Sequence, residues 1–146
     1  QMSDAQRVPP RILTPSDAIT AAASQVARSL GAAAIVTYTT SGSTTLRAAR
    51  ERPEMPILCM ARSAAISRRL MIAYGVHAVI GPVPDGFADK IRGAVRTAAA
   101  EGLAAPGDLV VVTAGDGDGV AGSTNVLRVA TVTTEGMPDM PECKAR

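Results

Sequence analysis

The chain has 146 residues, a formal net charge of +2 and a composition that is 47% hydrophobic but only 2% aromatic. Its length corresponds to one domain with a substantial core, which must be built from Ala, Val, Ile, Leu and Met side chains. The charge is too small and too scattered to indicate a nucleic-acid partner, and no apolar run approaches the roughly 18 residues of a membrane span.

Hydrophobic periodicity, helix-capping residues and turn residues predict four helices and five strands. In chain order these are a helix over 16–30, a strand over 33–38, a helix over 43–52, a strand over 56–61, a helix between the capping residue 63 and the closing glycine 75, a strand over 76–80, a helix over 85–101, and strands over 109–113 and 126–132. Three successive strand-helix units predict right-handed crossovers and a parallel sheet with helices on both faces. The short connection before the last strand favours an antiparallel arrangement for that strand.

The predicted fold class is therefore α/β, a three-layer α/β/α sandwich whose five-stranded sheet is mostly parallel. The globular domain is expected to span 14–132. Residues 1–13 are typical of a linker or N-terminal arm, and residues 133–146 are typical of a disordered tail. The start of the chain lacks a charged-then-apolar leader, and Cys59 and Cys143 lack the spacing of a disulfide or zinc site. A reduced, cytoplasmic protein is therefore expected.

A run of small hydroxyl residues with one glycine lies between the first predicted strand and the second predicted helix. Its members, the candidate phosphate-binding residues, are Thr39, Thr40, Ser41, Gly42, Ser43 and Thr44. Free N–H groups and the dipole at a helix start favour an anion such as phosphate, and ligands usually bind beyond the ends of parallel strands. An ordinary capped turn has the same composition, and composition alone favours that interpretation.

A second segment, rich in glycine, joins the last two predicted strands. Its candidate ligand-loop residues are Gly115, Gly117, Asp118, Gly119 and Gly122. Glycines let a backbone adopt positive φ and approach a ligand closely. A flexible hairpin is one alternative, and a calcium loop is another. The calcium loop fails on spacing, because Val120, Ala121 and Leu127 stand where it needs an oxygen ligand, a glycine and a bidentate Glu. The segment also lacks the lysine of a Walker motif.

Taken in this order, the two segments resemble the C-terminal α/β domain of pyruvate kinase. The 39–44 segment is similar to that family's effector phosphate loop, although Thr40 stands where several members carry a lysine. The 115–122 segment, followed by Thr124 and Asn125, resembles the loop that closes over the effector. The resemblance covers about residues 14–132, and its motifs are more specific as an ordered set than singly.

Two carboxylates depart from the family pattern. Asp116 and Asp118 stand where effector-binding members usually have apolar, Pro or basic residues, and at short range they would repel a bisphosphate. Lys90 lies near the position at which some members use an arginine, and it is a possible contact for a second phosphate. A monophosphate, or no effector at all, therefore fits this sequence better than fructose 1,6-bisphosphate.

The resemblance implies the C-terminal regulatory and oligomerisation domain of a pyruvate kinase. The whole enzyme of that family is glycolytic and transfers a phosphoryl group from phosphoenolpyruvate to ADP with Mg²⁺ and K⁺. The catalytic barrel of the same chain would be one partner of this domain, and self-association, typically into a tetramer of the whole enzyme, would supply another. The fragment itself is expected to hold no catalytic residue, cofactor or metal and to be inactive alone. Its expected ligand is a phosphorylated small molecule between the 39–44 and 115–122 loops.

Two other functions fit the sequence. One is a free-standing phosphate- or sugar-phosphate-binding relative, for which the chain offers no clear reactive group. Its only histidine, His77, has no partner at ligand spacing, and Asp85 and Asp89 are typical of a solvated helix face. The other is a purely structural oligomerisation domain, in which Asp116 and Asp118 keep anions out of a non-functional effector site.

Overall fold

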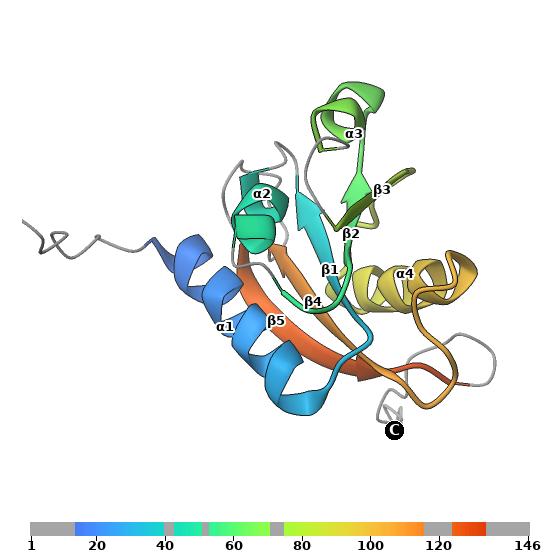
Figure 1. The fold of residues 1–146 in the computed structure, drawn as a ribbon. Coiled ribbons are helices and arrows are strands. Elements are labelled where there is room, and N and C mark those ends of the chain that lie inside the picture. The colour runs from blue at the N-terminus through green and yellow to red at the C-terminus, as the bar shows by residue number, and fades with distance from the viewer. Residues whose placement is uncertain (1–13, 40–42, 51–52, 71–74, 116–123, 134–146) are drawn as a thin grey trace, which may run out of the picture.

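The computed structural model describes residues 14–39, 43–50, 53–70, 75–115 and 124–133. Four helices and five strands lie within these ranges (Figure 1). In chain order they are α1 (Pro15–Leu30), β1 (Ala34–Thr39), α2 (Ser43–Arg50), β2 (Ile57–Ala61), α3 (Ala64–Leu70), β3 (Val76–Ile80), α4 (Phe87–Ala100), β4 (Leu109–Gly115) and β5 (Thr124–Thr131). Each predicted element is confirmed within these ranges, with small shifts at some ends, and residues 51–52 and 71–74 of two predicted helices lie outside the described residues.

The strands form one mixed sheet in the order β3-β2-β1-β4-β5. The first four strands pair in parallel, and β5 is antiparallel to β4, as the short connection between them predicts. In Figure 1, α1 and α2 cover one face of this sheet and α4 covers the other. The predicted three-layer α/β/α architecture is confirmed. No helix in the described ranges is both long and apolar enough to cross a membrane.

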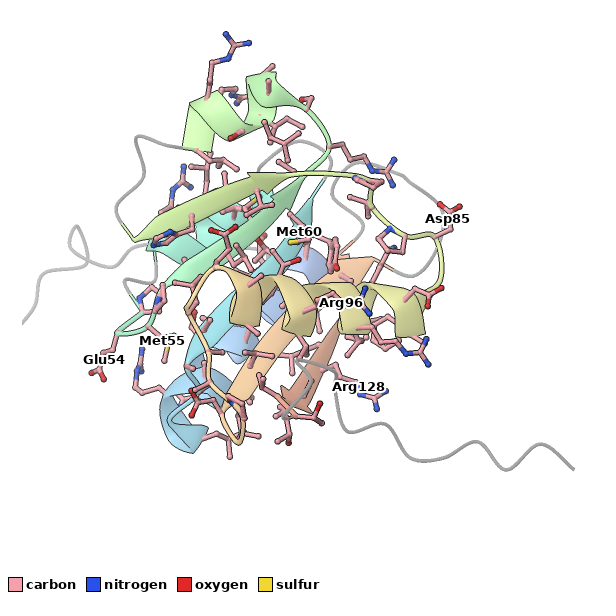
Figure 2. All side chains as sticks on the ribbon, turned by 90° about the vertical axis from the view of Figure 1, so that its right-hand side faces the viewer. Glu54, Met55, Met60, Asp85, Arg96 and Arg128 are labelled. Atoms are coloured by element: carbon pink, nitrogen blue, oxygen red, sulfur yellow. The ribbon has the colours of Figure 1, made fainter. Side chains whose placement is uncertain are left out.

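The core lies on both faces of the sheet because successive strand residues point to opposite sides. On β1, the side chain of Val36 packs with Ile91 and Val95 of α4, whereas Ile35 packs with Ala23 and Ala27 of α1 on the other face. Figure 2 shows Met60 of β2 beside α4, in the same cluster as Val36. Strands that are buried on both faces explain the nearly continuous apolar runs in β2 and β4.

The buried face of α1 contains small polar side chains as well as the apolar residues Ala23 and Ala27. Leu30, which continues the helical spacing of apolar residues, is 48% exposed, whereas Ser16, Thr20 and Ser24 are buried. The helix packs on β4 and β5 and beside α2. The Thr20 hydroxyl donates to the Ser16 carbonyl at 2.8 Å, so its polar group is satisfied inside the helix. Small size, and not hydrophobicity alone, decides which side of α1 is buried.

Both ends of α1 are capped by local hydrogen bonds. The Thr14 hydroxyl oxygen accepts from the Asp17 backbone N–H at 3.1 Å, and the Asp17 carboxylate accepts from the Thr14 backbone N–H at 3.2 Å. This reciprocal pair is a capping box. At the other end Gly31 adopts φ 61°, a left-handed conformation that favours glycine.

We expect Thr14→Ala to lower the free energy of unfolding by about 1 kcal/mol, because the substitution leaves a helix N–H without its side-chain acceptor. Urea unfolding followed by circular dichroism measures the change. The matched control is Thr97→Ala, the same substitution inside α4, where alanine is the better helix former and stability should be equal or slightly higher. Equal losses in both variants would contradict the capping role.

Candidate functional site

The two predicted ligand segments leave from neighbouring strand ends. β1 and β4 pair in parallel up to Thr37 and Thr113, and the strands then end at Thr39 and Gly115 respectively. The strand order reverses between them, since β1 continues through α2 to β2 whereas β4 continues to β5 on the other side. In parallel sheets the crevice at such a reversal is the usual ligand position.

The structure describes only part of the predicted site. Thr39 ends β1, while Ser43 and Thr44 open α2, and for these three residues the backbone alone is described. Several predicted residues lie outside the described ranges: Thr40, Ser41, Gly42, Gly117, Asp118, Gly119 and Gly122. Gly115 and Lys90 are described in full. The backbone therefore brings Thr39 and Gly115, the strand ends from which the two segments leave (their roots), to one edge of the sheet. The contacts of most predicted ligand residues stay predictions.

A pair of buried hydroxyls fixes α2 on β1. The Oγ1 atoms of Thr37 on β1 and Thr45 on α2 are 2.8 Å apart, and both side chains are fully buried. Cys59 on β2 faces the same pair. Burial raises the pKa of its thiol, and hydrogen bonds with Thr45 and Thr37 act in the opposite direction. The hydroxyl pair thus joins the strand before the 39–44 segment to the helix after it.

Lys90 lies beside the end of β4. The side chain is only 8% exposed, and its Nζ donates to the Gly115 carbonyl oxygen at 3.1 Å. Among the residues that the structure describes, its ammonium has no carboxylate partner. A buried positive charge, held against a neutral carbonyl, therefore stands at the root of the glycine-rich segment.

Tyr38 connects the end of β1 to the same lysine. Its hydroxyl donates to the Lys90 backbone carbonyl at 2.5 Å. Burial raises the pKa of this hydroxyl well above its usual range, and the backbone N–H of Ala94 opposes that shift only in part. Gly93 leaves space for this approach, since a Cβ at that position would lie 3.0 Å from the Tyr38 hydroxyl oxygen.

Sequence reasoning missed the roles of Tyr38, Thr37 and Thr45. The available signals were weak: Tyr38 is a rare aromatic residue at the end of an otherwise aliphatic strand, and Thr45 extends the hydroxyl run by one position. Neither pattern predicts which residue is the hydrogen-bond partner, because the residues that complete each contact lie elsewhere in the chain.

The other titratable side chains singled out in the sequence are exposed. His77 is exposed on β3. Figure 2 shows Asp85 pointing away from the sheet before α4, and Asp89 pairs with Arg92 at 2.9 Å on the exposed surface of that helix. The predicted solvated helix face is therefore confirmed for Asp89, whereas Asp85 is exposed but precedes the helix. The described residues contain no group of three or more His, Cys, Asp and Glu side chains that could hold a metal ion.

Comparison with known proteins gives consistent matches. A family model described as pyruvate kinase, alpha/beta domain, matches residues 17–130. A pyruvate kinase of Methylorubrum extorquens is 40% identical over 122 residues, which are 84% of this chain and 26% of that protein. A pyruvate kinase of Geobacillus stearothermophilus is 38% identical over 128 residues, which are 88% of this chain and 22% of that protein. The chain thus spans about a quarter of the length of these relatives.

Proposed function

Because this chain belongs to the pyruvate kinase α/β-domain family, we propose that it is the C-terminal regulatory and oligomerisation domain of a pyruvate kinase. In this proposal a phosphorylated small molecule binds between the 39–44 and 115–122 segments. Its binding favours one quaternary state of the enzyme through a difference in affinity between states.

One observation carries the effector-binding part of the proposal. The roots of both segments lie at the same edge of the sheet, on the neighbouring strands β1 and β4. The buried ammonium of Lys90 lies at the Gly115 root, and the opening turn of α2 follows the other root. A positive charge and a helix start at one strand edge favour an anionic ligand. Two of the three N–H donors of Lys90 remain for a phosphate once Gly115 is bonded.

Catalysis belongs to the rest of the proposed enzyme. The family's reaction transfers a phosphoryl group from phosphoenolpyruvate to ADP, with Mg²⁺ and K⁺, in a barrel domain that would be the partner of this domain within one cytoplasmic chain. We expect the 146-residue chain to be inactive by itself, because the residues of that barrel are not part of its sequence.

Charge in the glycine-rich segment restricts the proposed effector. Asp116 and Asp118 add two negative charges next to Gly115 in the sequence, and unscreened repulsion at short range disfavours a doubly phosphorylated ligand. A hexose or pentose monophosphate or AMP is therefore proposed over fructose 1,6-bisphosphate.

The oligomerisation part of the proposal concerns α1 and β5. β5 is the last strand of the sheet and pairs only with β4 among the described strands, so its outer backbone groups need a partner or a cover. Val129 on this strand is 36% exposed, and α1 packs beside it. A second copy of the chain, related by a two-fold axis, would cover both elements.

Titration calorimetry against fructose 1,6-bisphosphate, glucose 6-phosphate, ribose 5-phosphate and AMP tests the effector site. We expect saturable binding of a monophosphate, and binding weaker by on the order of 100-fold in the double variant Ser41→Ala, Thr44→Ala. Two lost hydrogen bonds to a charged phosphate account for this factor at about 1.5 kcal/mol each. The control double variant Ser29→Ala, Thr97→Ala removes hydroxyls from the helices α1 and α4 and should bind like the parent.

The same titration distinguishes the proposed effector-binding domain from the two other functions that fit the sequence. A folded protein in its native oligomeric state that binds none of the four ligands would contradict the effector site and favour a purely structural oligomerisation domain. In that case Asp116→Asn with Asp118→Asn should restore phosphate binding, if repulsion is what excludes the anion. Tight binding of one ligand by a chain that is monomeric in solution would favour a free-standing phosphate-binding relative.

A further inference from the structure

Lys90 is a buried charge in a helix whose other inward-facing side chains are apolar. It precedes Ile91 on α4, and both side chains are buried. Taking an ammonium group out of water is unfavourable unless polar groups replace its hydration. A methionine would fill similar space without that penalty. The position of the Lys90 ammonium, and not packing alone, therefore accounts for a lysine here.

The carbonyl that Lys90 holds lies at an irregular point of the sheet. β4 and β5 pair regularly from Leu109 and Thr131 up to Ala114 and Val126, and the register then shifts at Gly115, which pairs with Thr124. Such a shift disturbs the ladder of backbone hydrogen bonds and leaves polar groups that need other partners. The Lys90 Nζ supplies one, at 3.1 Å from the Gly115 carbonyl oxygen.

The backbone of Lys90 is itself held by β1. The Tyr38 hydroxyl donates to the Lys90 carbonyl, while the Lys90 N–H donates to the Gly86 carbonyl at the start of α4. Tyr38 comes one residue before the end of β1, and Gly115 is the last residue of β4. Two hydrogen bonds through one residue thus connect the ends of two neighbouring strands.

We propose that Lys90 is a positioning residue that fixes the end of β4 relative to the end of β1, with Tyr38 orienting the turn of α4 from which it acts. This role exists in the ligand-free protein. Its consequence for ligand binding rests on the proposed effector function, since the two strand ends are the roots of the proposed ligand segments.

Amide hydrogen exchange of the ligand-free protein, measured by NMR, tests the proposal with Lys90→Met. This variant keeps the length and apolar stem but removes the charge and the donors. We expect exchange around the Gly115–Thr124 pair to accelerate roughly tenfold or more, because a hydrogen bond from a charged donor is lost there. Exchange around the Leu109–Thr131 pair, at the other end of the same ladder, should change less than about threefold.

This comparison of the two ladder ends distinguishes positioning from a general contribution to stability. Equal acceleration at both ends, or no acceleration at the Gly115 end, would overturn the proposal. The control variant Arg96→Met removes an exposed cation from the same helix (Figure 2) and should leave the Gly115 end like the parent.

A second measurement keeps Lys90 in place and so does not depend on the folding of Lys90→Met. The chain has only two lysines, Lys90 and Lys144, so Lys144→Arg assigns the remaining ammonium signal in a ¹H–¹⁵N spectrum. The Lys90 ammonium protons are expected to exchange with water roughly tenfold or more slowly than those of free lysine, as buried, bonded donors. Exchange as fast as in free lysine would overturn the anchoring role.

Calorimetry with the four phosphorylated ligands separates this proposal from the proposed function. If the parent binds none of them but Lys90→Met still accelerates exchange at Gly115, the effector site fails and the positioning role stands. If Lys90→Met weakens ligand binding without altering exchange in the ligand-free protein, Lys90 acts as a direct phosphate contact and the positioning role fails.

Discussion

Replacing Ile91 by alanine is expected to lower the free energy of unfolding by about 2–5 kcal/mol. Ile91 is fully buried between α4 and the sheet, where it packs in one cluster with Leu58 and Val95. Removing its outer atoms leaves a cavity that close-packed neighbours fill only in part. Since domains of this size are stable by only about 5–15 kcal/mol, the loss is a large fraction of the total. The midpoint of thermal unfolding should fall by on the order of 10 °C.

Ile80→Ala provides the matched control for this prediction. Ile80 lies on the edge strand β3 and is 54% exposed, so the same substitution should cost less than about 1 kcal/mol. Urea unfolding of both variants, followed by circular dichroism, gives the two free energies. Similar losses at the two positions would mean that α4 does not pack on the sheet through Ile91 as described.

The layers of the fold could be predicted because each depends on local sequence. The periodicity of Ile91, Val95 and Ala98 defines the inward face of α4, and all three residues are fully buried in the structure. The order of the strands could not be predicted in the same way. Strands such as Leu58–Met60 and Val110–Val112 are apolar on both faces. Apolar runs of this kind do not predict which strand will pair with which in the sheet.

The candidate site shows a similar division. Its two segments could be recognised from their composition and from the family resemblance, since glycine and hydroxyl runs are visible in sequence. The contacts that position them could not, because they join residues far apart in the chain. Tyr38 and Lys90 are separated by 52 positions, and no periodicity relates an aromatic hydroxyl to a helix carbonyl at that distance. The family resemblance indicates Lys90 as a possible phosphate contact, whereas its hydrogen bond to Gly115 follows only from the fold.

Tyr38 is expected to make the protein's stability depend on pH above about 10. Its hydroxyl is buried and donates to the Lys90 carbonyl, so the folded state favours the protonated form and raises the pKa of this group well above its usual range. In the unfolded chain the hydroxyl ionises near its ordinary value of about 10. The stabilisation is therefore complete below pH 10 and decreases as the pH rises toward the folded pKa, by about 1.4 kcal/mol for each pH unit.

Tyr38→Phe isolates this contribution. At neutral pH the variant should be less stable by about 1 kcal/mol, the net value of a typical hydrogen bond. Between pH 10 and 12 its disadvantage should shrink and then reverse, because phenylalanine has no proton to lose in the unfolded state. Cys59, whose thiol pKa is also raised by burial, is present in both proteins, so its contribution cancels in the difference.

Two measurements test the alkaline prediction directly. Urea unfolding of the parent and Tyr38→Phe between pH 8 and 12 gives the difference in stability, and a difference that stays constant with pH would contradict a buried, protonated Tyr38.

The chain has no Trp and only two tyrosines, so in Tyr74→Phe the tyrosinate absorbance reports Tyr38 alone. Ionisation of that tyrosine at its ordinary pKa while the protein is still folded would show that its hydroxyl is not held by Lys90. It would also remove the link from β1 on which the positioning role of Lys90 depends.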